Sequence, residues 1–409
     1  MKSLDIGIAG AGPGGLAAAL FLSRAGHRVR LVERFDRPQP VGSGLMLQPT
    51  GLAALHALGL YRQMAALGAP IDRLVGTDAK SGRKVLEVRY HPLGPEQHAL
   101  GVHRSALFGV LHDAVAEAQL PIRSGYTVTH LQRDKSKSWL LSPQGLEGPF
   151  DLVVDALGAQ SPLKPFARQQ GTSRPLEYGA IWATTPWTDA GFDRQALTQR
   201  YCGSSVMIGV MPVGRPQADG PELAALFWSL KPADYAQVMQ RGFPAWREAV
   251  AAYWPATAPH LDAIGGLERM TLARYHHHTL PVPAGEGIAF IGDSAHSTSP
   301  QLGQGANMAL LDAAALAAAL GAADSLDDAL GRYAALRRWH VRLYQLLSLT
   351  LTPFYQSDSA VMPMLRDFLV SALGRIPPMP LLLAGMVSGQ LLSPLKAIGL
   401  DPAPLGEVR

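Results

Sequence analysis

A glycine-rich turn near the N-terminus, set between two apolar segments, constrains the fold of this 409-residue chain more than any other feature. Residues 4–10 (LDIGIAG) form a short apolar run that is typical of a buried strand. Residues 14–26 have helical content and end at a glycine, and residues 27–34 (HRVRLVER) predict a second strand. A strand, a helix and a strand within about thirty residues predict a βαβ unit, and hence a parallel sheet with a right-handed crossover.

The turn itself matches the pattern G-x-G-x-x-G at Gly10, Gly12 and Gly15. One glycine permits the tight turn, one lets the backbone approach a pyrophosphate, and one lets the helix pack against the strand. The helix N-terminus adds free N–H groups and a positive dipole end for phosphates. Glu33, 23 residues after Gly10, is placed to accept hydrogen bonds from both ribose hydroxyls and to repel a 2′-phosphate. The motif predicts FAD or NAD rather than NADP; a turn without a ligand is the alternative.

A second glycine-rich segment lies at residues 287–313, where an apolar strand ends at Asp293 and Gly303, Gly305 and Ala306 lead into an Ala/Leu-rich helix. The N–H groups of such a helix start favour negative charge, which a reduced flavin carries around N1 and O2. We expect Asp293 to contact a ribityl chain, and Gly305 and Ala306 to lie beside the ring. No second G-x-G-x-x-G turn follows a strand, so both segments are expected to bind one dinucleotide.

The middle of the chain differs in character from its ends. Residues 171–285 hold five of the seven tryptophans, many prolines and runs of alternating apolar residues, which predict a mostly antiparallel sheet with helices. Residues 48–68 predict one amphipathic helix, residues 73–90 a β-hairpin, and residues 104–119 another helix. Nucleotide-type turns lie on both sides of the middle region, so the nucleotide-binding domain is expected to be discontinuous in sequence.

Three segments resemble the flavoprotein hydroxylases of the para-hydroxybenzoate hydroxylase type, which include the ubiquinone-biosynthesis hydroxylases. They are residues 10–34, residues 101–111 (GVHRSALFGVL) and residues 292–313 (GDSAHSTSPQLGQGANMALLDA). The third matches the family pattern GDAAHxxxPxxGQGxNxAxxDA almost throughout, and Ser294 is the visible change.

The resemblance covers most of residues 1–170 and 285–345, and it implies an FAD-dependent monooxygenase of the class A flavoprotein hydroxylase type. In that class NADPH or NADH reduces FAD, O2 adds at flavin C4a, and the hydroperoxide delivers one oxygen atom to an aromatic or polycyclic small molecule. Oxygen insertion beside a carbonyl, of the Baeyer–Villiger kind, is a variant. The alternatives are an FAD-dependent reductase or dehydrogenase of the same fold, and a flavin-binding scaffold protein without turnover.

The implied fold is α/β, with a Rossmann-like FAD-binding domain on a GR2-type parallel sheet, a mostly antiparallel substrate domain and a helical C-terminus. The expected segments are the FAD-binding domain in residues 1–72, 101–170 and 286–330, the substrate domain in residues 73–100 and 171–285, and a helical region in residues 331–409. The cofactor-binding residues that the resemblance implies are Gly10, Gly12, Gly14, Gly15, Glu33, Arg34, Gly44, Gln48, Arg104, Val128, Asp293, Pro300, Gly303, Gly305 and Ala306.

Residues 151–164 (DLVVDALGAQSPLK) depart from the family pattern DLVVGADGxxSxxR. Asp155 stands where the family has a glycine, Leu157 where it has the aspartate of an Asp-Gly pair, and Lys164 where it has an arginine. That pair is linked to the handling of both FAD and NAD(P)H. FAD binding is expected to survive the change, whereas direct reduction by NAD(P)H is expected to be slow or to depend on a separate reductase.

No residue is assigned as catalytic, because ring hydroxylation needs only a substrate phenolate or enolate. His296 lies in a tightly built turn and is expected to be a packing residue. Residues 276–278 are three consecutive histidines, but adjacent positions on a strand cannot all face one ion, so no metal site is expected.

Composition limits the partners and the location. The formal net charge of +4 comes from scattered Lys and Arg, so nucleic acid is not an expected partner; a small aromatic substrate and O2 are. Cys202 is the single cysteine, and with no signal segment this predicts a cytoplasmic protein. Residues 379–395 carry no charge and predict a buried or lid-forming helix, with weak membrane contact as the alternative.

Overall fold

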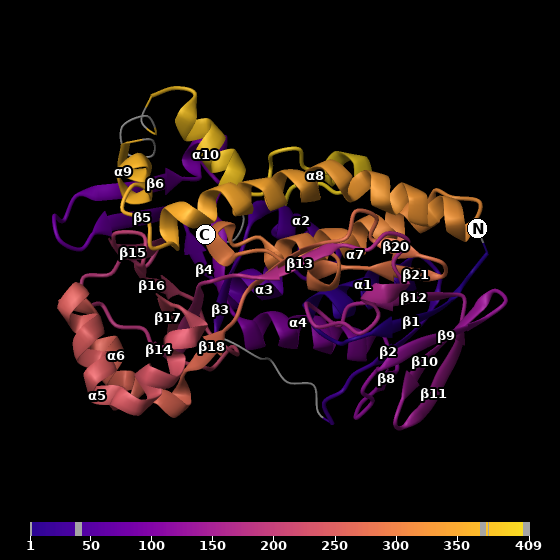
Figure 1. The fold of residues 1–409 in the computed structure, drawn as a ribbon. Helices are drawn as coiled ribbons and strands as arrows, with labels where there is room; N and C mark the ends of the chain where they lie inside the picture. The colour runs from indigo at the N-terminus through magenta and orange to yellow at the C-terminus, as the bar shows by residue number, and fades with distance from the viewer. Residues whose placement is uncertain (1, 37–42, 369–373, 375, 404–409) are drawn as a thin grey trace.

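The computed structural model describes residues 2–36, 43–368, 374 and 376–403. Two large sheets lie toward opposite ends of the molecule, and the long helix α8 (Leu326–Tyr355) runs past both of them (Figure 1). The predicted α/β fold, with a discontinuous parallel-sheet domain and a second, mostly antiparallel sheet, is confirmed.

The six-stranded sheet is built from three separate parts of the chain. Its order is β20 (Ala284–Gly285), β21 (Ile288–Phe290), β12 (Leu152–Asp155), β1 (Asp5–Ala9), β2 (Arg28–Val32) and β8 (Ile122–Arg123). Its strands pair in parallel except at the β20 edge. Ile6, Ile8 and Val154 are fully buried, as expected for a parallel sheet covered by helices. Helix α1 (Pro13–Arg24) joins β1 to β2, so the predicted βαβ unit is present.

Helices α1 and α7 (Gly305–Gly321) pack against each other over this sheet. Their contact is made of glycine and alanine: a Cβ added to Gly14 would lie 3.2 Å from the Cβ of Ala309. Small side chains therefore bring the two helices close together, and both helices begin at the same edge of the sheet (Figure 1).

The seven-stranded sheet combines the middle of the chain with the predicted hairpin, which is confirmed as β5 and β6. Its order is β18 (Thr271–Ala273), β14 (Gly179–Pro186), β17 (Leu223–Leu230), β16 (Val206–Pro212), β15 (Ala196–Cys202), β5 (Arg73–Asp78) and β6 (Lys84–Arg89). Neighbouring strands are antiparallel except β15 and β5. Helices α5 (Tyr235–Tyr253) and α6 (Ala258–Ile264) cover one face, where Trp246 and Trp254 pack among aliphatic side chains.

Three smaller sheets and five further helices belong to the described part of the chain. The sheets are β3 (Gly44–Leu47), β7 (Ala99–His103) and β4 (Ala69–Ile71); β9 (His130–Asp134), β10 (Lys137–Ser142) and β11 (Gly145–Phe150); and β13 (Thr172–Pro175) with β19 (His276–Thr279). The helices are α2 (Pro49–Ala57), α3 (Tyr61–Leu67), α4 (Arg104–Glu117), α9 (Met362–Arg366) and α10 (Met379–Val387).

The single helix expected over residues 48–68 is wrong, because the chain forms α2 and α3 there. Gly59 lies between them with a φ of 68°, in the left-handed region that glycine reaches without strain. The N–H of Gly59 donates to the carbonyl of His56, and that of Leu60 donates to the carbonyl of Leu55, which is the Schellman pattern of a helix end. The apolar pattern continues across this break, so periodicity alone cannot show it.

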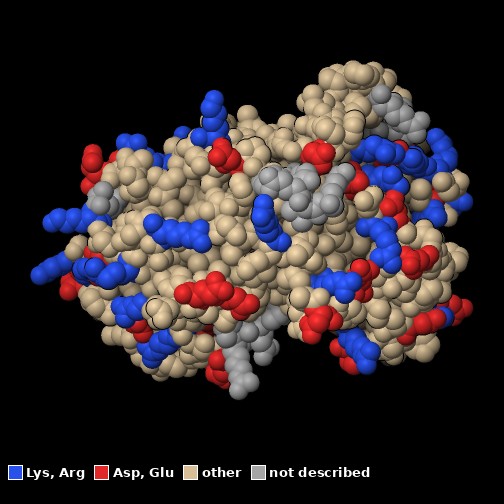
Figure 2. Space-filling model, turned by 180° about the vertical axis from the view of Figure 1, so that it is seen from behind, with Lys and Arg blue, Asp and Glu red and all other residues tan. Residues whose placement is uncertain are grey.

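The lobe formed by α9 and α10 differs from the rest of the surface. Figure 2 shows Lys and Arg interspersed with Asp and Glu over the body of the molecule, whereas the lobe at upper right is nearly free of charge. Its exposed apolar side chains include Val361, Met364, Leu381 and Leu382. Within the described ranges, no helix combines the length and the apolar character that crossing a membrane requires.

Candidate functional site

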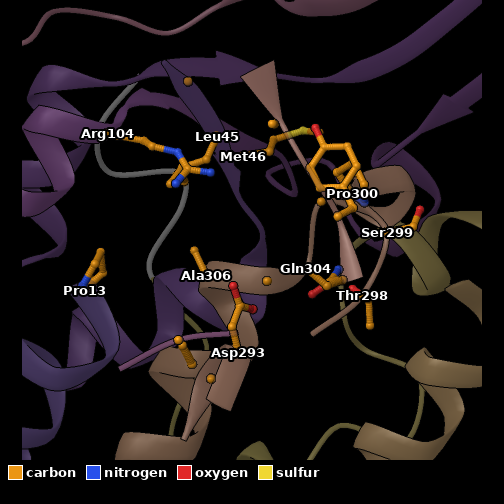
Figure 3. A pocket seen from close by; sticks show the side chains of 18 of the residues that line it. Pro13, Leu45, Met46, Arg104, Asp293, Thr298, Ser299, Pro300, Gln304 and Ala306 are labelled. Atoms are coloured by element: carbon orange, nitrogen blue, oxygen red, sulfur yellow. The ribbon is translucent and has the colours of Figure 1, made fainter. Parts of the chain in front are cut away.

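A cavity of about 1230 Å³ is lined by the loops that follow β1, β2, β12 and β21 of the six-stranded sheet and by strands of the seven-stranded sheet. Figure 3 shows part of its lining. A site for one small ligand measures roughly 300–1,000 Å³, so this cavity has room for a larger ligand or for two. Most of the predicted site residues line it: Gly10, Gly12, Gly14, Glu33, Arg34, Gly44, Arg104, Val128, Asp293, Pro300, Gly303, Gly305 and Ala306. Gly15 and Gln48 are not among the lining residues.

Gly15 and Gln48 shape the wall from behind. A Cβ added to Gly15 would lie 2.0 Å from the carbonyl oxygen of Gly10, so glycine is needed there for α1 to close on its own turn. Gln48 is fully buried, and its Oε1 accepts a hydrogen bond from the Tyr90 hydroxyl at 2.7 Å. Its backbone N–H donates to Oδ1 of Asn307 at 2.8 Å, which ties the end of β3 to α7.

The N-termini of α1 and α7 both begin at the cavity wall. Their capping residues, Gly12 and Gln304, make no side-chain hydrogen bond to the first turn. The free N–H groups and positive dipole ends of both helices are therefore available to a ligand. A Cβ added to Gly12 would meet no atom within 4 Å, so the first turn is open to close approach. The arrangement attracts negatively charged groups at two points of one cavity.

Glu33 is held by the loop it faces and keeps capacity for a ligand. Its Oε2 accepts the N–H of Ala11 at 2.8 Å, and its Oε1 accepts the N–H of Phe35 at 3.2 Å. A carboxylate has about four acceptor sites, so about two remain for hydroxyl groups.

Arg104 and Asp293 extend into the same part of the cavity (Figure 3). Protein surrounds Asp293, and its side chain is accessible from within the cavity. The resulting desolvation raises the pKa of Asp293 above its ordinary value, although the charges of His296, Arg104 and Lys164 oppose the shift. Among the described residues the Asp293 carboxylate has no hydrogen-bond partner, so it is available to a ligand hydroxyl.

His296 does not line the cavity but lies beneath the loop that does. Its Nε2 is 2.6 Å from Oδ2 of Asp312, which also accepts the N–H of Gly292 at 2.8 Å. Nε of Arg337 donates to Oδ1 of the same carboxylate at 2.6 Å. Burial opposes ionisation of Asp312, but His296 and Arg337 outweigh it and lower its pKa to about 2. This buried ion cluster anchors the turn that presents Asp293.

The loop at the start of α7 is tied to α10 and β3 by amides that sequence reasoning missed. Nε2 of Gln304 donates to the carbonyl of Val387 at 2.7 Å. Nδ2 of Asn307 donates to the carbonyls of Met46 and Gly303 at 3.1 and 2.9 Å. The family pattern contains both amides, which is the available signal, but the partners Val387 and Met46 lie far away in sequence.

The segment of residues 151–164, which departs from the family pattern, places a carboxylate inside the protein. Asp155 is fully buried; its Oδ1 accepts the N–H of Leu157 at 2.9 Å, and the Ser161 hydroxyl donates to its Oδ2. Burial raises the pKa of Asp155 to about 6, although both hydrogen bonds and the charge of Lys164 oppose the shift. Leu157 lines the cavity at the position where the family has its aspartate.

The half of the cavity against the seven-stranded sheet is uncharged. The charged side chains that line the cavity within the described residues all belong to the other half: Glu33, Arg34, Arg104 and Asp293. Trp182 and Phe227 pack with ring centroids 4.7 Å apart, and Nε1 of Trp182 donates to the Tyr275 hydroxyl at 2.9 Å. Alternate residues of β15 face this space, as strand geometry requires: Leu197, Gln199 and Tyr201.

The three consecutive histidines lie on β19, outside the cavity lining. His278 is buried, with its Nδ1 3.1 Å from the carbonyl oxygen of Thr172 on β13. In the part of the chain that the structure describes, no three His, Cys, Asp or Glu side chains form a group that could hold a metal ion.

Comparison with known proteins shows where this arrangement recurs. A family model described as "FAD binding domain" matches residues 3–148 and 234–342. The chain is 25% identical over 349 residues to an FAD-dependent urate hydroxylase of Klebsiella pneumoniae, covering 84% of the chain and 87% of the relative. It is 26% identical over 395 residues to a 2-heptyl-3-hydroxy-4(1H)-quinolone synthase of Mycobacteroides abscessus, covering 92% and 96%. Its fold matches the crystal structure of Klebsiella pneumoniae HpxO complexed with FAD and uric acid, with a TM-score of 0.80, 21% identity, and coverage of 96% and 98%.

The buried Asp155 predicts a pH-dependent stability. Its folded pKa of about 6 lies above the ordinary 3.8, so the folded state favours the protonated form, and this stabilisation is lost as pH rises from about 4 to 6. At pH 8 an Asp155→Asn variant should be more stable than the wild type by about 1–3 kcal/mol, and at pH 4 the two should unfold alike. Urea unfolding across this range checks the prediction, and a difference independent of pH contradicts it.

Proposed function

The chain belongs to the FAD binding domain family and is an FAD-dependent monooxygenase, and from this premise we propose that it hydroxylates an uncharged aromatic or heteroaromatic small molecule. The observation that supports the proposal is the division of one cavity into a charged half with two helix N-termini and an uncharged aromatic half. NADPH or NADH supplies the electrons and O2 supplies the oxygen atom.

The charged half fits FAD. We infer that Gly12 and Gly14 approach the pyrophosphate at the N-terminus of α1, that Glu33 accepts the ribose hydroxyls, and that Asp293 and Arg104 hold the ribityl region. The other cofactor contacts in this proposal are Gly10, Arg34, Gly44, Val128, Pro300, Gly303, Gly305 and Ala306. When bound, FAD supplies the activation of O2, and the protein supplies position and a dry environment.

Tyr275 is the group of the uncharged half best placed to orient a substrate. Its hydroxyl accepts the Trp182 N–H, so its own proton remains for a ligand oxygen. Burial raises the pKa of Tyr275 to about 12, so the hydroxyl stays protonated at neutral pH and acts as a donor. A substrate carbonyl or hydroxyl held there would lie in a space walled by aromatic and aliphatic side chains.

The lack of charged side chains in the uncharged half of the cavity favours a neutral substrate over a charged one. The relatives are named for urate, an anion, and for an alkylquinolone, a neutral bicyclic compound with an apolar chain. The charge of Arg104 acts on Tyr275 from the other half of the cavity, so an anion placed against Trp182, Phe227 and Leu197 would lose its hydration and regain only part of that free energy. We therefore favour a neutral substrate of the second kind.

The remaining expectations stay proposals: the six-segment division of the chain, a cytoplasmic location, the absence of a nucleic-acid partner, and weak membrane contact through residues 379–395 near the C-terminus. Baeyer–Villiger insertion and a reductase or dehydrogenase without oxygen transfer remain the alternative reactions.

Oxygen transfer can be tested with the FAD-loaded protein, NADPH or NADH, and 18O2. A neutral alkylquinolone should accelerate nicotinamide oxidation and yield a product with one 18O atom by mass spectrometry. A quinoline carboxylate of similar size, which adds a charge, should be turned over at least about tenfold less efficiently, since an unpaired buried charge costs more than 1.4 kcal/mol. Nicotinamide oxidation that yields only peroxide with every aromatic compound would support the reductase alternative, and preference for the carboxylate would contradict the neutral substrate.

Alanine substitutions of Asp293 and His296 should affect different properties, FAD affinity in the first case and thermal stability in the second. Asp293→Ala removes a charge-assisted hydrogen bond to the ribityl chain, so FAD affinity should fall about ten- to a hundredfold. His296→Ala leaves the buried Asp312 carboxylate with one hydrogen-bond partner fewer, so the melting temperature should fall while FAD affinity in the folded protein changes less. Titration of apoprotein with FAD and thermal unfolding measure both effects; unchanged affinity in Asp293→Ala would remove Asp293 from the site.

Because Leu157 stands where the family has an aspartate, we expect NADPH or NADH to reduce the flavin slowly. A double variant, Asp155→Gly with Leu157→Asp, restores the family pattern at the cavity wall and removes the buried carboxylate. If the missing aspartate matters, anaerobic bleaching of the flavin by NADPH or NADH should be about tenfold faster than in the wild type, as one added charge-assisted hydrogen bond allows. Leu157→Asn with Asp155→Gly is the uncharged control. Fast reduction of the wild type that does not change in the folded double variant would show that the altered motif costs no function.

A further inference from the structure

Gln356 ends α8 with an unused carboxamide. Its backbone N–H donates to the carbonyl of Thr352 at 2.8 Å, as the last bond of the helix. Its side chain lines the cavity and is only 5% exposed, and within the described residues neither Nε2 nor Oε1 has a hydrogen-bond partner. A buried amide without partners destabilises the folded protein, so two such atoms on one side chain indicate a partner from outside the chain.

The end of α8 is fixed against the seven-stranded sheet. Ser357 donates its N–H to the carbonyl of Ser204 at 3.0 Å, and the Ser204 hydroxyl donates to the carbonyl of Phe354 at 3.0 Å. The buried Arg366 donates to the carbonyl of Gly203 at 3.0 Å in the same turn. The C-terminal end of α8, which Gln356 caps, therefore lies beside the turn that follows β15. This end of α8 is the one away from the six-stranded sheet (Figure 1).

Gln199, which lines the same cavity, differs from Gln356 because its carboxamide has partners within the protein. Oε1 of Gln199 accepts the Tyr201 hydroxyl at 2.9 Å, and its Nε2 contacts the Met207 sulfur at 3.6 Å. Its donor and its acceptor are both directed to protein groups. Gln356 keeps both free.

We propose that the Gln356 carboxamide binds a lactam edge of the substrate, where an N–H and a C=O lie side by side on a heteroaromatic ring. A carboxamide donates through Nε2 and accepts through Oε1, so such an edge satisfies both atoms at once. A single hydroxyl reaches only one of them, and a carboxylate offers no donor. Both amide atoms are buried in this structure, so the side chain has to rotate for the amide to face a ligand in the cavity. The inference rests on the proposed function and narrows it to neutral heteroaromatic substrates with adjacent N–H and C=O groups, such as a 2(1H)-quinolinone. A 4(1H)-quinolone carries these groups on opposite sides of the ring and would satisfy only one of the two amide atoms.

The test uses three uncharged probes of similar shape: 2(1H)-quinolinone, which has the lactam edge, 1-methyl-2-quinolinone, which lacks the donor, and quinoline at pH 8, which lacks the N–H and the C=O. Binding to the FAD-loaded protein is followed by the change in flavin absorbance, without turnover. The wild type should bind 2(1H)-quinolinone about tenfold more tightly than either other probe. Gln356→Met, similar in size, should bind all three within about twofold and should melt no lower than the wild type, because it removes two unpaired buried atoms.

Gln199→Met is the matched control, because it removes a carboxamide that is already paired within the protein. It should keep the preference for 2(1H)-quinolinone. Equal binding of the three probes by the wild type, no measurable binding of 2(1H)-quinolinone, or the same preference in a folded Gln356→Met would overturn the proposal. A chain that fails to retain FAD or to oxidise NAD(P)H would instead count against the proposed function, so the two failures are distinguishable.

Discussion

The close contact between α1 and α7 is the constraint on which the site depends. Gly14 and Ala309 leave no room for larger side chains between the helices, and this contact sets two uncapped helix N-termini at one cavity. The turn that leads into α7 is anchored from below, because Asp312 accepts hydrogen bonds from Gly292 and Arg337 and pairs with His296. Disturbing either feature would move the groups that line the charged half of the cavity.

The local parts of the site could be predicted from sequence, because their signals are short. The turn at Gly10 to Gly15 and the segment around Asp293 combine strand, turn and helix start within a few residues. Gln48 is an exception, because its side chain bonds to Tyr90 and its backbone N–H to Asn307, and it does not line the cavity. Gly59 ends a helix inside a continuous apolar pattern, which periodicity cannot reveal.

For the uncharged half of the cavity, the sequence predicts a mostly antiparallel sheet but not which of its residues line a site. These residues come together only in the folded chain. The parallel pairing of β15 with β5 joins segments more than a hundred residues apart. Gln356 lies at the end of a long helix and carries no sequence signal. The sequence shows that Asp155 departs from the family pattern. Only the folded structure shows that its carboxylate is buried and accepts hydrogen bonds from Leu157 and Ser161.

The division of the cavity gives a physical account of the chemistry that the fold supports. Charges and helix N-termini line the half of the cavity in which we propose that FAD binds, and aromatic and aliphatic side chains line the half that we propose for the substrate. Gln304 ties the loop at the start of α7 to α10, so both elements belong to the same cavity wall. Exclusion of water from such a space strengthens every electrostatic interaction within it.

The account depends on one dinucleotide spanning the charged half, and the cofactor of the purified protein tests this most directly. Heat denaturation followed by chromatography of the released flavin should give one FAD per chain, with nothing left attached to the protein. Release of FMN, a flavin that stays covalently bound, or a chain that cannot be loaded with FAD would contradict it.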